Sequence, residues 1–148
     1  MSKAVQAFLS GIFFTFILDF FLFLGIFENY IKVNGIDLYY NILFSDNQSF
    51  VLFFLLSIIL GYITLYKSTK LSLIVLLTLS VLALSTLITP IGNSVGSMMF
   101  THKNVHIQMQ KFSYQGDILY EGRSDISFYD YKFKKILQLQ KNKIIGEE

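Results

Sequence analysis

Residues 13–25 read FFTFILDFFLFLG, and Asp19 in the middle is the only charged residue of this run. The run belongs to an apolar segment over residues 4–27, and two more such segments cover residues 50–66 and 71–89. A helix needs about 20 apolar residues to cross a hydrocarbon core of roughly 30 Å. The sequence therefore predicts three transmembrane helices.

The composition indicates the same environment. Of the 148 residues, 53% are hydrophobic and 15% are charged, whereas soluble domains carry roughly 25% charged residues. The net charge is only +2, and no basic stripe with interleaved aromatic residues argues for a nucleic-acid partner. The chain has no cysteine, which excludes disulfides and thiolate metal sites. We expect a mainly α membrane protein whose first partner is the lipid bilayer.

Two other interpretations of the apolar segments are disfavoured. Three buried helices of a soluble protein would leave no polar face toward water. A cleaved signal peptide fits Lys3 and the first apolar residues, but the run continues past Asp19 to Phe27 without a small-residue cleavage pattern. We expect the first segment to stay in place as a signal anchor.

Lysines in the short loops predict the orientation, because cytoplasmic loops carry an excess of positive charge. Lys3 precedes the first segment, and Lys67 and Lys70 lie in the turn between the second and third. The loop over residues 28–49 carries only Lys32 against three acidic residues. We expect the N-terminus in the cytoplasm and the C-terminus in the periplasm, in a bacterial inner membrane.

The loop over residues 28–49 has a helical apolar pattern. Its apolar positions are spaced at i, i+3, i+4, i+7 and i+8, and Asn34 is a candidate N-cap. The positions are Ile36, Tyr39, Tyr40, Leu43 and Phe44. The pattern predicts an amphipathic helix, and two interpretations stay open. The helix lies on the outer membrane interface, or it packs on the C-terminal domain.

The chain changes character after Thr89. Residues 90–99 are rich in glycine, serine and proline, which predicts an exit linker that ends a membrane region over 1–99. Residues 100–148 then alternate with a period of two, which predicts a small antiparallel β module outside the cytoplasm. We expect strands over 105–110, 116–120 and 129–140. The pattern points Val105, Ile107, Met109, Tyr131, Phe133 and Leu137 inward and His106, Gln108, Gln110, Lys132 and Lys134 outward.

Residues 116–126 (GDILYEGRSDI) and 131–136 (YKFKKI) follow a pattern of Gly-x-apolar, a polar turn with serine and an alternating strand. The pattern resembles a β-sandwich-like repeat at the C-terminal end of small uncharacterised inner-membrane proteins of epsilonproteobacteria, a family of the domain-of-unknown-function type. The resemblance covers about 25 residues, and Gly122-Arg123 stands where such repeats usually carry asparagine. The resemblance implies an architecture for the module and no catalytic residues.

Few side chains in the sequence suggest catalysis or metal binding. His102 and His106 have the i, i+4 spacing of a helical metal site, but strand spacing would place them about 13 Å apart. The four acidic residues Asp117, Glu121, Asp125 and Asp130 fit a solvated surface better than a calcium site. No phosphate-binding loop and no nucleophile pattern is present. We expect neither an enzyme nor a cofactor.

Asp19 is the one residue in the apolar segments that needs an explanation, since a charge at bilayer depth costs about 2.5–3.5 kcal/mol. Steps of four lead back from Asp19 to Thr15, Gly11 and Ala7, a small-residue stripe that allows close helix approach. We expect Asp19 to face the other helices. Hydroxyl partners for it are Ser57 in the second segment and Thr78 and Ser85 in the third. A proton- or ion-linked role and a contact with a partner subunit are the alternatives.

These observations favour a non-enzymatic membrane accessory or assembly protein that presents its β module for contacts with a protein partner or a second copy. The alternative is a small subunit of a transporter or channel in which Asp19 is linked to the transported ion or proton. The two differ in what they require of Asp19. Hydrogen bonding between helices tolerates asparagine at this position, whereas proton coupling does not.

Overall fold

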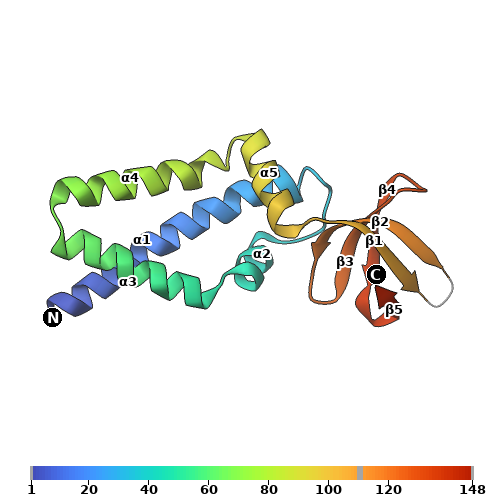
Figure 1. The fold of residues 1–148 in the computed structure, drawn as a ribbon, viewed down its shortest axis with the longest axis horizontal. Helices are drawn as coiled ribbons and strands as arrows, with labels where there is room; N and C mark the ends of the chain where they lie inside the picture. Colours follow the sequence, from blue (N-terminus) through green and yellow to red (C-terminus); the bar gives the residue numbers. More distant parts are fainter. Residues whose placement is uncertain (1, 110–111, 148) are drawn as a thin grey trace.

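The computed structural model describes residues 2–109 and 112–147 as a helical part followed by an antiparallel sheet (Figure 1). The helices are α1 (Lys3–Ile26) with a π-helical extension η1 (Phe27–Ile31), α2 (Tyr40–Asn47), α3 (Phe50–Tyr66), α4 (Thr69–Ser85) and α5 (Thr89–Phe100). The strands are β1 (His102–Met109), β2 (Ser113–Glu121), β3 (Asp125–Asp130), β4 (Lys135–Gln140) and β5 (Ile144–Glu147), with a 3-10 turn η2 (Lys141–Lys143) before β5.

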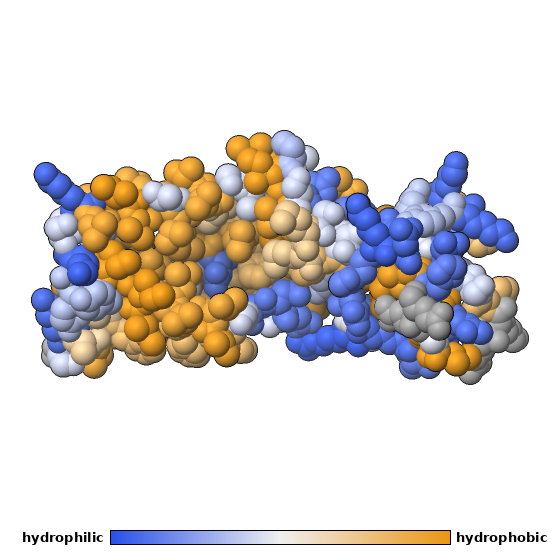
Figure 2. Space-filling model, viewed as in Figure 1, coloured by the Kyte–Doolittle hydropathy of each residue, from blue (hydrophilic) through white to orange (hydrophobic). Residues whose placement is uncertain are grey.

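The predicted apolar segments are helices in the structure. Among the described residues, only α1 with its extension is long and apolar enough to cross a membrane as one helix. The second predicted segment coincides with α3, and the third is α4, which already ends at Ser85. By length and composition α2–α3 and α4–α5 would each suffice as a pair, but the pairs are bent by 81° and 87°. Figure 2 shows apolar side chains over the viewed face of the helical part and hydrophilic ones over the sheet.

Small residues bring α1 and α3 into backbone contact. A Cβ atom on Gly11 would lie 1.8 Å from the carbonyl oxygen of Ser57, and one on Gly61 would lie 2.1 Å from that of Ala7. The small-residue stripe of α1 therefore faces Ser57 and Gly61 of α3, as the four-residue spacing predicts. Only glycine permits this separation, since any side chain would push the two helices apart.

The expected exit linker over residues 90–99 is wrong, because this stretch forms α5. Pro90 lies in the first turn of the helix, where its missing N–H costs nothing. The glycines serve close packing instead of chain flexibility. Cβ atoms on Gly92 and Gly96 would lie 2.1 Å from the Thr86 carbonyl oxygen and 2.4 Å from the Tyr30 ring, respectively.

The sheet has the strand order β4-β3-β2-β1-β5, and every neighbouring pair is antiparallel. Flat strands spaced about 4.8 Å apart would separate β4 from β5 by about 19 Å. Only η2 joins these outer strands, and the chain from Gln140 to Ile144 reaches at most about 14 Å. The sheet must therefore curl into a half-barrel. Its concave face encloses Ile107, Ile118, Ile126, Phe128 and Leu139.

The expected single strand over residues 129–140 is wrong, and Gln110 lies outside the described residues. Residues 131–134 form a turn between β3 and β4, in which the Asp130 carboxylate accepts a hydrogen bond from the Phe133 N–H at 2.7 Å. Lys134 has φ = 51°. Tyr131 and Phe133 are therefore exposed instead of inward, and Leu137 is half-buried.

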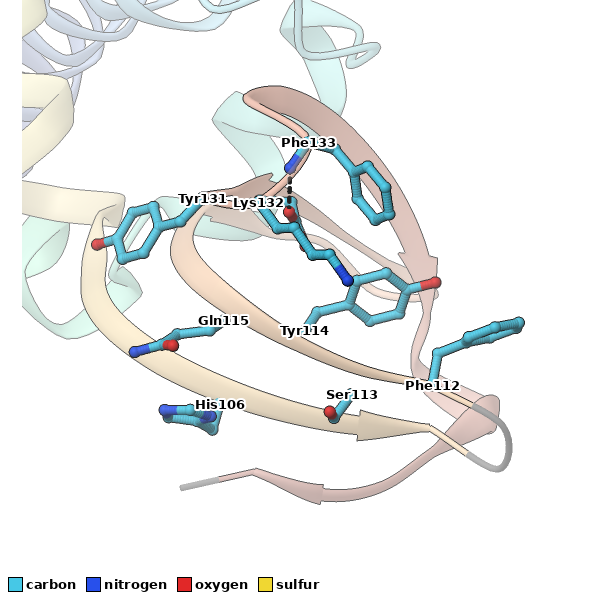
Figure 3. A pocket seen from close by; sticks show the side chains of 9 residues that line it. His106, Phe112, Ser113, Tyr114, Gln115, Tyr131, Lys132 and Phe133 are labelled. Atoms are coloured by element: carbon cyan, nitrogen blue, oxygen red, sulfur yellow. Dashed lines mark hydrogen bonds between the residues drawn. The ribbon is translucent and has the colours of Figure 1, made fainter.

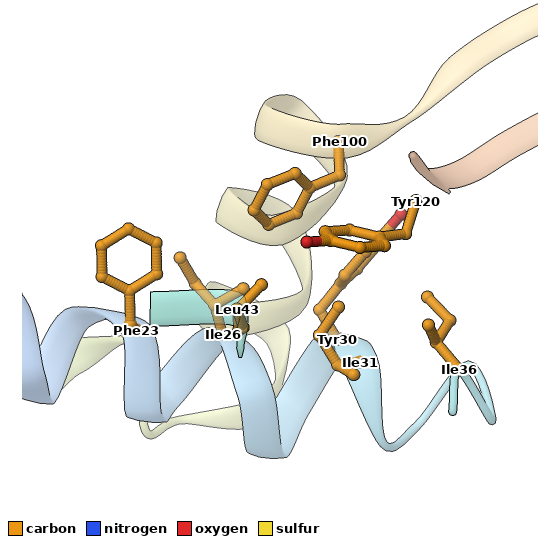
Figure 4. Packing of buried hydrophobic residues seen from close by; sticks show 8 residues of the cluster. All are labelled: Phe23, Ile26, Tyr30, Ile31, Ile36, Leu43, Phe100 and Tyr120. Carbon is orange, nitrogen blue, oxygen red and sulfur yellow. The ribbon is translucent and has the colours of Figure 1, made fainter. Parts of the chain in front are cut away.

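A second hydrophobic cluster joins the helices to the sheet (Figure 4). Its buried members come from α1, η1, the following loop, α2, α5 and β2. They are Phe23, Ile26, Tyr30, Ile31, Ile36, Leu43, Phe100 and Tyr120. We call this cluster the junction. Because five segments of the helical part and one strand share it, the sheet is packed against the helices and is not a tethered domain.

Candidate functional site

Asp19 bonds to a residue that the sequence analysis did not consider. Its Oδ2 accepts a hydrogen bond of 3.0 Å from the Nε2 of Gln48, in the break between α2 and α3. Because Asp19 is half-buried, its carboxylate loses hydration, and the hydrogen bond from Gln48 offsets part of that cost. The predicted bonds to Ser57, Thr78 or Ser85 are wrong.

The three hydroxyls bond within their own helices. Ser57 donates to the Phe53 carbonyl, Thr78 to the Ile74 carbonyl and Ser85 to the Leu82 carbonyl. Local bonding of this kind is the usual way for a helix to satisfy a hydroxyl. Ser57 is buried where α1 crosses α3, whereas Thr78 is exposed on α4.

Thr15 differs from the other hydroxyl residues of the helices. Its side chain is fully buried between Gly11 and Asp19 on the inward stripe of α1. Its Oγ1 has no hydrogen-bond partner within the described part of the chain. The inward stripe of α1 thus carries one carboxylate with a single side-chain hydrogen bond and one buried hydroxyl with none among the described residues.

A cavity of about 430 Å³ lies beside Asp19, between α1, α3 and the break between α2 and α3. Its wall is apolar, and Asn47, Gln48 and Ser49 lie with Asp19 at the helix break. The apolar lining comes from Leu22, Phe23, Leu52, Phe53, Leu55, Leu56, Ile59 and Met99. We call this space the Asp19 cavity. Its volume falls in the range of small-molecule sites, about 300–1,000 Å³.

The two sharp helix breaks lie at the same level of α1. Gln48, in the break between α2 and α3, bonds Asp19. Thr86, in the break between α4 and α5, lies 3.4 Å and 3.3 Å through its Oγ1 from the carbonyl oxygens of Phe21 and Leu22. Both helices that run beside α1 therefore change direction within one turn of Asp19. The Thr86–Pro90 spacing is the signal in the sequence that marks the second break.

The expected interfacial helix begins at Tyr40 and not near Asn34, which lies in the preceding turn and bonds the Tyr30 carbonyl. Ile36 and Leu43 are buried in the junction, while Tyr39 is 73% exposed. The Tyr40 hydroxyl donates to the Phe20 carbonyl at 3.0 Å, and the Phe44 ring packs edge-on against Phe16 and Phe23. The helix thus packs on α1.

Helix α2 also contacts the sheet, which favours the second of the two open interpretations. Asn47 donates to the Tyr120 hydroxyl at 3.1 Å. Asp46 forms a two-point ion pair with Arg123, whose Nε donates at 2.8 Å. This hydrogen bond raises the pKa of the Arg123 guanidinium above its ordinary value.

Tyr30 is the polar centre of the junction. Its hydroxyl donates to the Leu119 carbonyl of β2 at 2.7 Å and lies 2.7 Å from the Thr101 hydroxyl. Its ring packs on Gly96 and near the ring of Phe100. One side chain of η1 therefore bonds both Thr101, immediately before β1, and Leu119 of the central strand β2.

The β module carries its own cleft of about 790 Å³ (Figure 3). Aromatic rings of Phe112, Tyr114 and Phe133 line it together with Lys132 and His106. Phe112 and Phe133 are 65% and 56% exposed, so the cleft presents two aromatic rings at its surface. We call this surface the module cleft.

Tyr131 borders the module cleft and ties the turn after β3 to β1 and β2. Its hydroxyl bonds the carboxylate of Asp117 and lies 3.1 Å from the Oδ1 of Asn104. The hydrogen bond to Asp117 raises the pKa of Tyr131 above its ordinary value.

The other polar candidates stay apart. His102 and His106 are both exposed on β1. The four acidic residues bond separate neighbours: Asp117 bonds Tyr131, Glu121 pairs with Lys141, Asp125 bonds Ser124 and Asp130 bonds the Phe133 N–H. Within residues 2–109 and 112–147, no three His, Asp or Glu side chains come together as a metal site.

No family model, curated protein or solved structure matches the chain. Two features of the structure bear on function. The first is that both helix breaks contact α1 within one turn of Asp19. The second is the junction, which packs the module against the helices.

Proposed function

We propose that α1, α3 and α4 each cross the membrane and that the helix breaks mark its outer boundary. From Lys3 to Asp19 α1 rises about 24 Å, and α3 and α4 are each about 26 Å long at 1.5 Å per residue. These lengths are slightly below a hydrocarbon core of roughly 30 Å, a mismatch that local thinning of the bilayer accommodates. Beyond the boundary, α2 and α5 turn aside and surround the upper part of α1.

The opposite end of the bundle supports a cytoplasmic N-terminus. Lys3 lies 4.8 Å from the centre of the Tyr66 ring, and Lys67 lies 5.5 Å from that of Tyr62. Lysines and tyrosines are the residues that gather at a membrane interface, and positive charge favours the cytoplasmic side. The module then lies in the periplasm of a bacterium.

The absence of cysteine allows a direct test of this topology. Ser68→Cys lies in the turn between α3 and α4, and Asn142→Cys lies in the module. A membrane-impermeant maleimide added to spheroplasts should label Asn142→Cys and leave Ser68→Cys unlabelled until the membrane is opened. Labelling of Ser68→Cys in intact spheroplasts would contradict both the spans and their orientation.

On this topology the chain acts as a non-enzymatic accessory or assembly protein that presents its β module to a protein partner. The junction is the observation that carries the proposal. Tyr30 bonds two segments of the module, and Arg123 and Tyr120 bond α2. A module fixed at one height and angle above the bilayer suits contact with another membrane-bound protein, and the module cleft offers it exposed aromatic rings.

A photo-crosslinking amino acid at Phe133 tests this proposal in native membranes. Gln138, exposed on β4 outside the module cleft, is the matched control position. We expect a discrete protein adduct from position 133 and none from position 138. Equal adducts from both positions, or adducts to lipid alone, would contradict a partner site at the module cleft.

The alternative of a transporter or channel subunit draws on the carboxylate of Asp19 beside a cavity. Proteoliposomes that carry a pH-sensitive dye distinguish it. Proton flux that Asp19→Asn abolishes would favour the alternative, whereas the accessory function predicts no flux from either protein.

A further inference from the structure

The Asp19 cavity has a mostly apolar wall and a polar end at the helix break. Leu52, Phe53 and Leu56 of α3 line it together with Leu22 and Phe23 of α1. The walls therefore favour an aliphatic chain, since they offer few polar groups away from the helix break. Met99 of α5 also lines it, and methionine adapts readily to a flexible ligand.

At the polar end of the cavity, the Asp19 carboxylate is the group that a positively charged donor would bind. A carboxylate accepts up to about four hydrogen bonds, and Asp19 receives a single side-chain bond, from Gln48. No lysine, arginine or histidine forms an ion pair with Asp19 within the described residues. An ammonium group at this point would complement the charge and form charge-assisted hydrogen bonds.

The level of the cavity identifies the source of such a ligand, and this step rests on the proposed function. If the helix breaks mark the outer membrane boundary, Asp19 lies at the depth where headgroups meet acyl chains. A bilayer lipid presents an aliphatic chain below this level and its headgroup above it. We propose that the Asp19 cavity holds one acyl chain of a phospholipid whose primary ammonium headgroup binds Asp19.

Native mass spectrometry of the full chain tests the proposal. The protein is exchanged into micelles with equal amounts of phosphatidylethanolamine, phosphatidylcholine and phosphatidylglycerol of matched chains. We expect retained phosphatidylethanolamine to exceed phosphatidylcholine about fivefold, because a quaternary ammonium has no N–H to donate. Equal retention by the wild-type protein would overturn the proposal without any variant.

Two variants separate the headgroup from the chain. Asp19→Asn should lower the preference to about one, while Asp37→Asn, on the exposed loop, should keep it. Leu56→Trp should fill the cavity and reduce the retention of all three lipids. A preference that survives Asp19→Asn, or a second copy of the chain retained in place of lipid, would overturn the lipid site. Neither result would alter the cysteine labelling, so the topology stands or falls separately.

Discussion

The substitution Gly11→Ala tests the contact that sets the distance between α1 and α3. The added methyl carbon would lie 1.8 Å from the Ser57 carbonyl oxygen and 2.9 Å from the Gly61 nitrogen. Both neighbours are backbone atoms and cannot rotate away. An ordinary contact needs roughly 3.5 Å, so the helices must separate by more than about 1.5 Å at their crossing.

The cost follows from two opposing effects. Overpacking of a well-packed interface costs typically about 1–3 kcal/mol. Alanine in place of a helical glycine returns roughly 0.5–1 kcal/mol through backbone entropy. Because the separation also weakens packing at the second contact of Gly61 with Ala7, we expect a net loss of about 1–2 kcal/mol in the free energy of unfolding.

Unfolding in mixed micelles of increasing SDS fraction, followed by circular dichroism, measures this loss. Val5→Leu is the control, since it adds one carbon on an exposed part of α1, and it should change stability by less than about 0.5 kcal/mol. Equal stability of Gly11→Ala and the wild-type protein would show that α1 and α3 are not in backbone contact.

Three further predictions concern single side chains. Phe128→Ala should destabilise the module by about 3–5 kcal/mol because Phe128 is fully buried, and Phe133→Ala should change it by less than about 0.5 kcal/mol; thermal unfolding compares them. Tyr30→Phe should speed proteolysis at the junction and cost about 1–2 kcal/mol through two lost hydrogen bonds, whereas the exposed Tyr39→Phe should not. Thr15→Val should stabilise the bundle by about 1 kcal/mol in the SDS titration, since it removes an unpaired buried hydroxyl; a loss of stability would reveal a hidden partner.

The positions of α1, α3 and α4 could be predicted because their signal is local, whereas α5 was expected as a linker. A run of apolar residues with few charges indicates a buried or lipid-facing helix without knowledge of its neighbours, and α3 matches the predicted range at both ends. The break at Thr86 could not be predicted in this way. The Thr86–Pro90 spacing marks where the helix is interrupted, but the change of direction depends on contacts with Gly25 and with the α1 carbonyls.

The strands show a limit of prediction from alternating apolar and polar residues. Ile107 is buried on β1 as the period-two pattern predicts. The same pattern continues through residues 131–134, where the chain instead turns on a hydrogen bond from the Phe133 N–H to Asp130. An aspartate that accepts from the backbone three residues on favours a turn, and this signal competed with the alternating aromatic residues. As a result, Tyr131 and Phe133 were predicted to point inward, whereas both are exposed.

The partner of Asp19 depends on the fold as a whole. The stripe of small residues below it could be read from four-residue spacing, because that spacing is a property of one helix. Gln48 lies 29 residues further along the chain. Gln48 reaches Asp19 only because α2 packs against α1, which places the break between α2 and α3 beside Asp19. No spacing rule in the sequence joins these two positions.

The length of α1 explains how the membrane part and the module become one unit. With its extension it has 29 residues, about 44 Å at 1.5 Å per residue, which exceeds a bilayer core of roughly 30 Å. Its first half exposes Phe13 and Phe16, while its upper part buries Ile26 and Ile31 completely. On the proposed topology, the part of α1 below Asp19 contacts lipid and the part above it belongs to a protein core. Because one continuous helix spans both environments, any tilt of the bundle in the membrane must move the module with it.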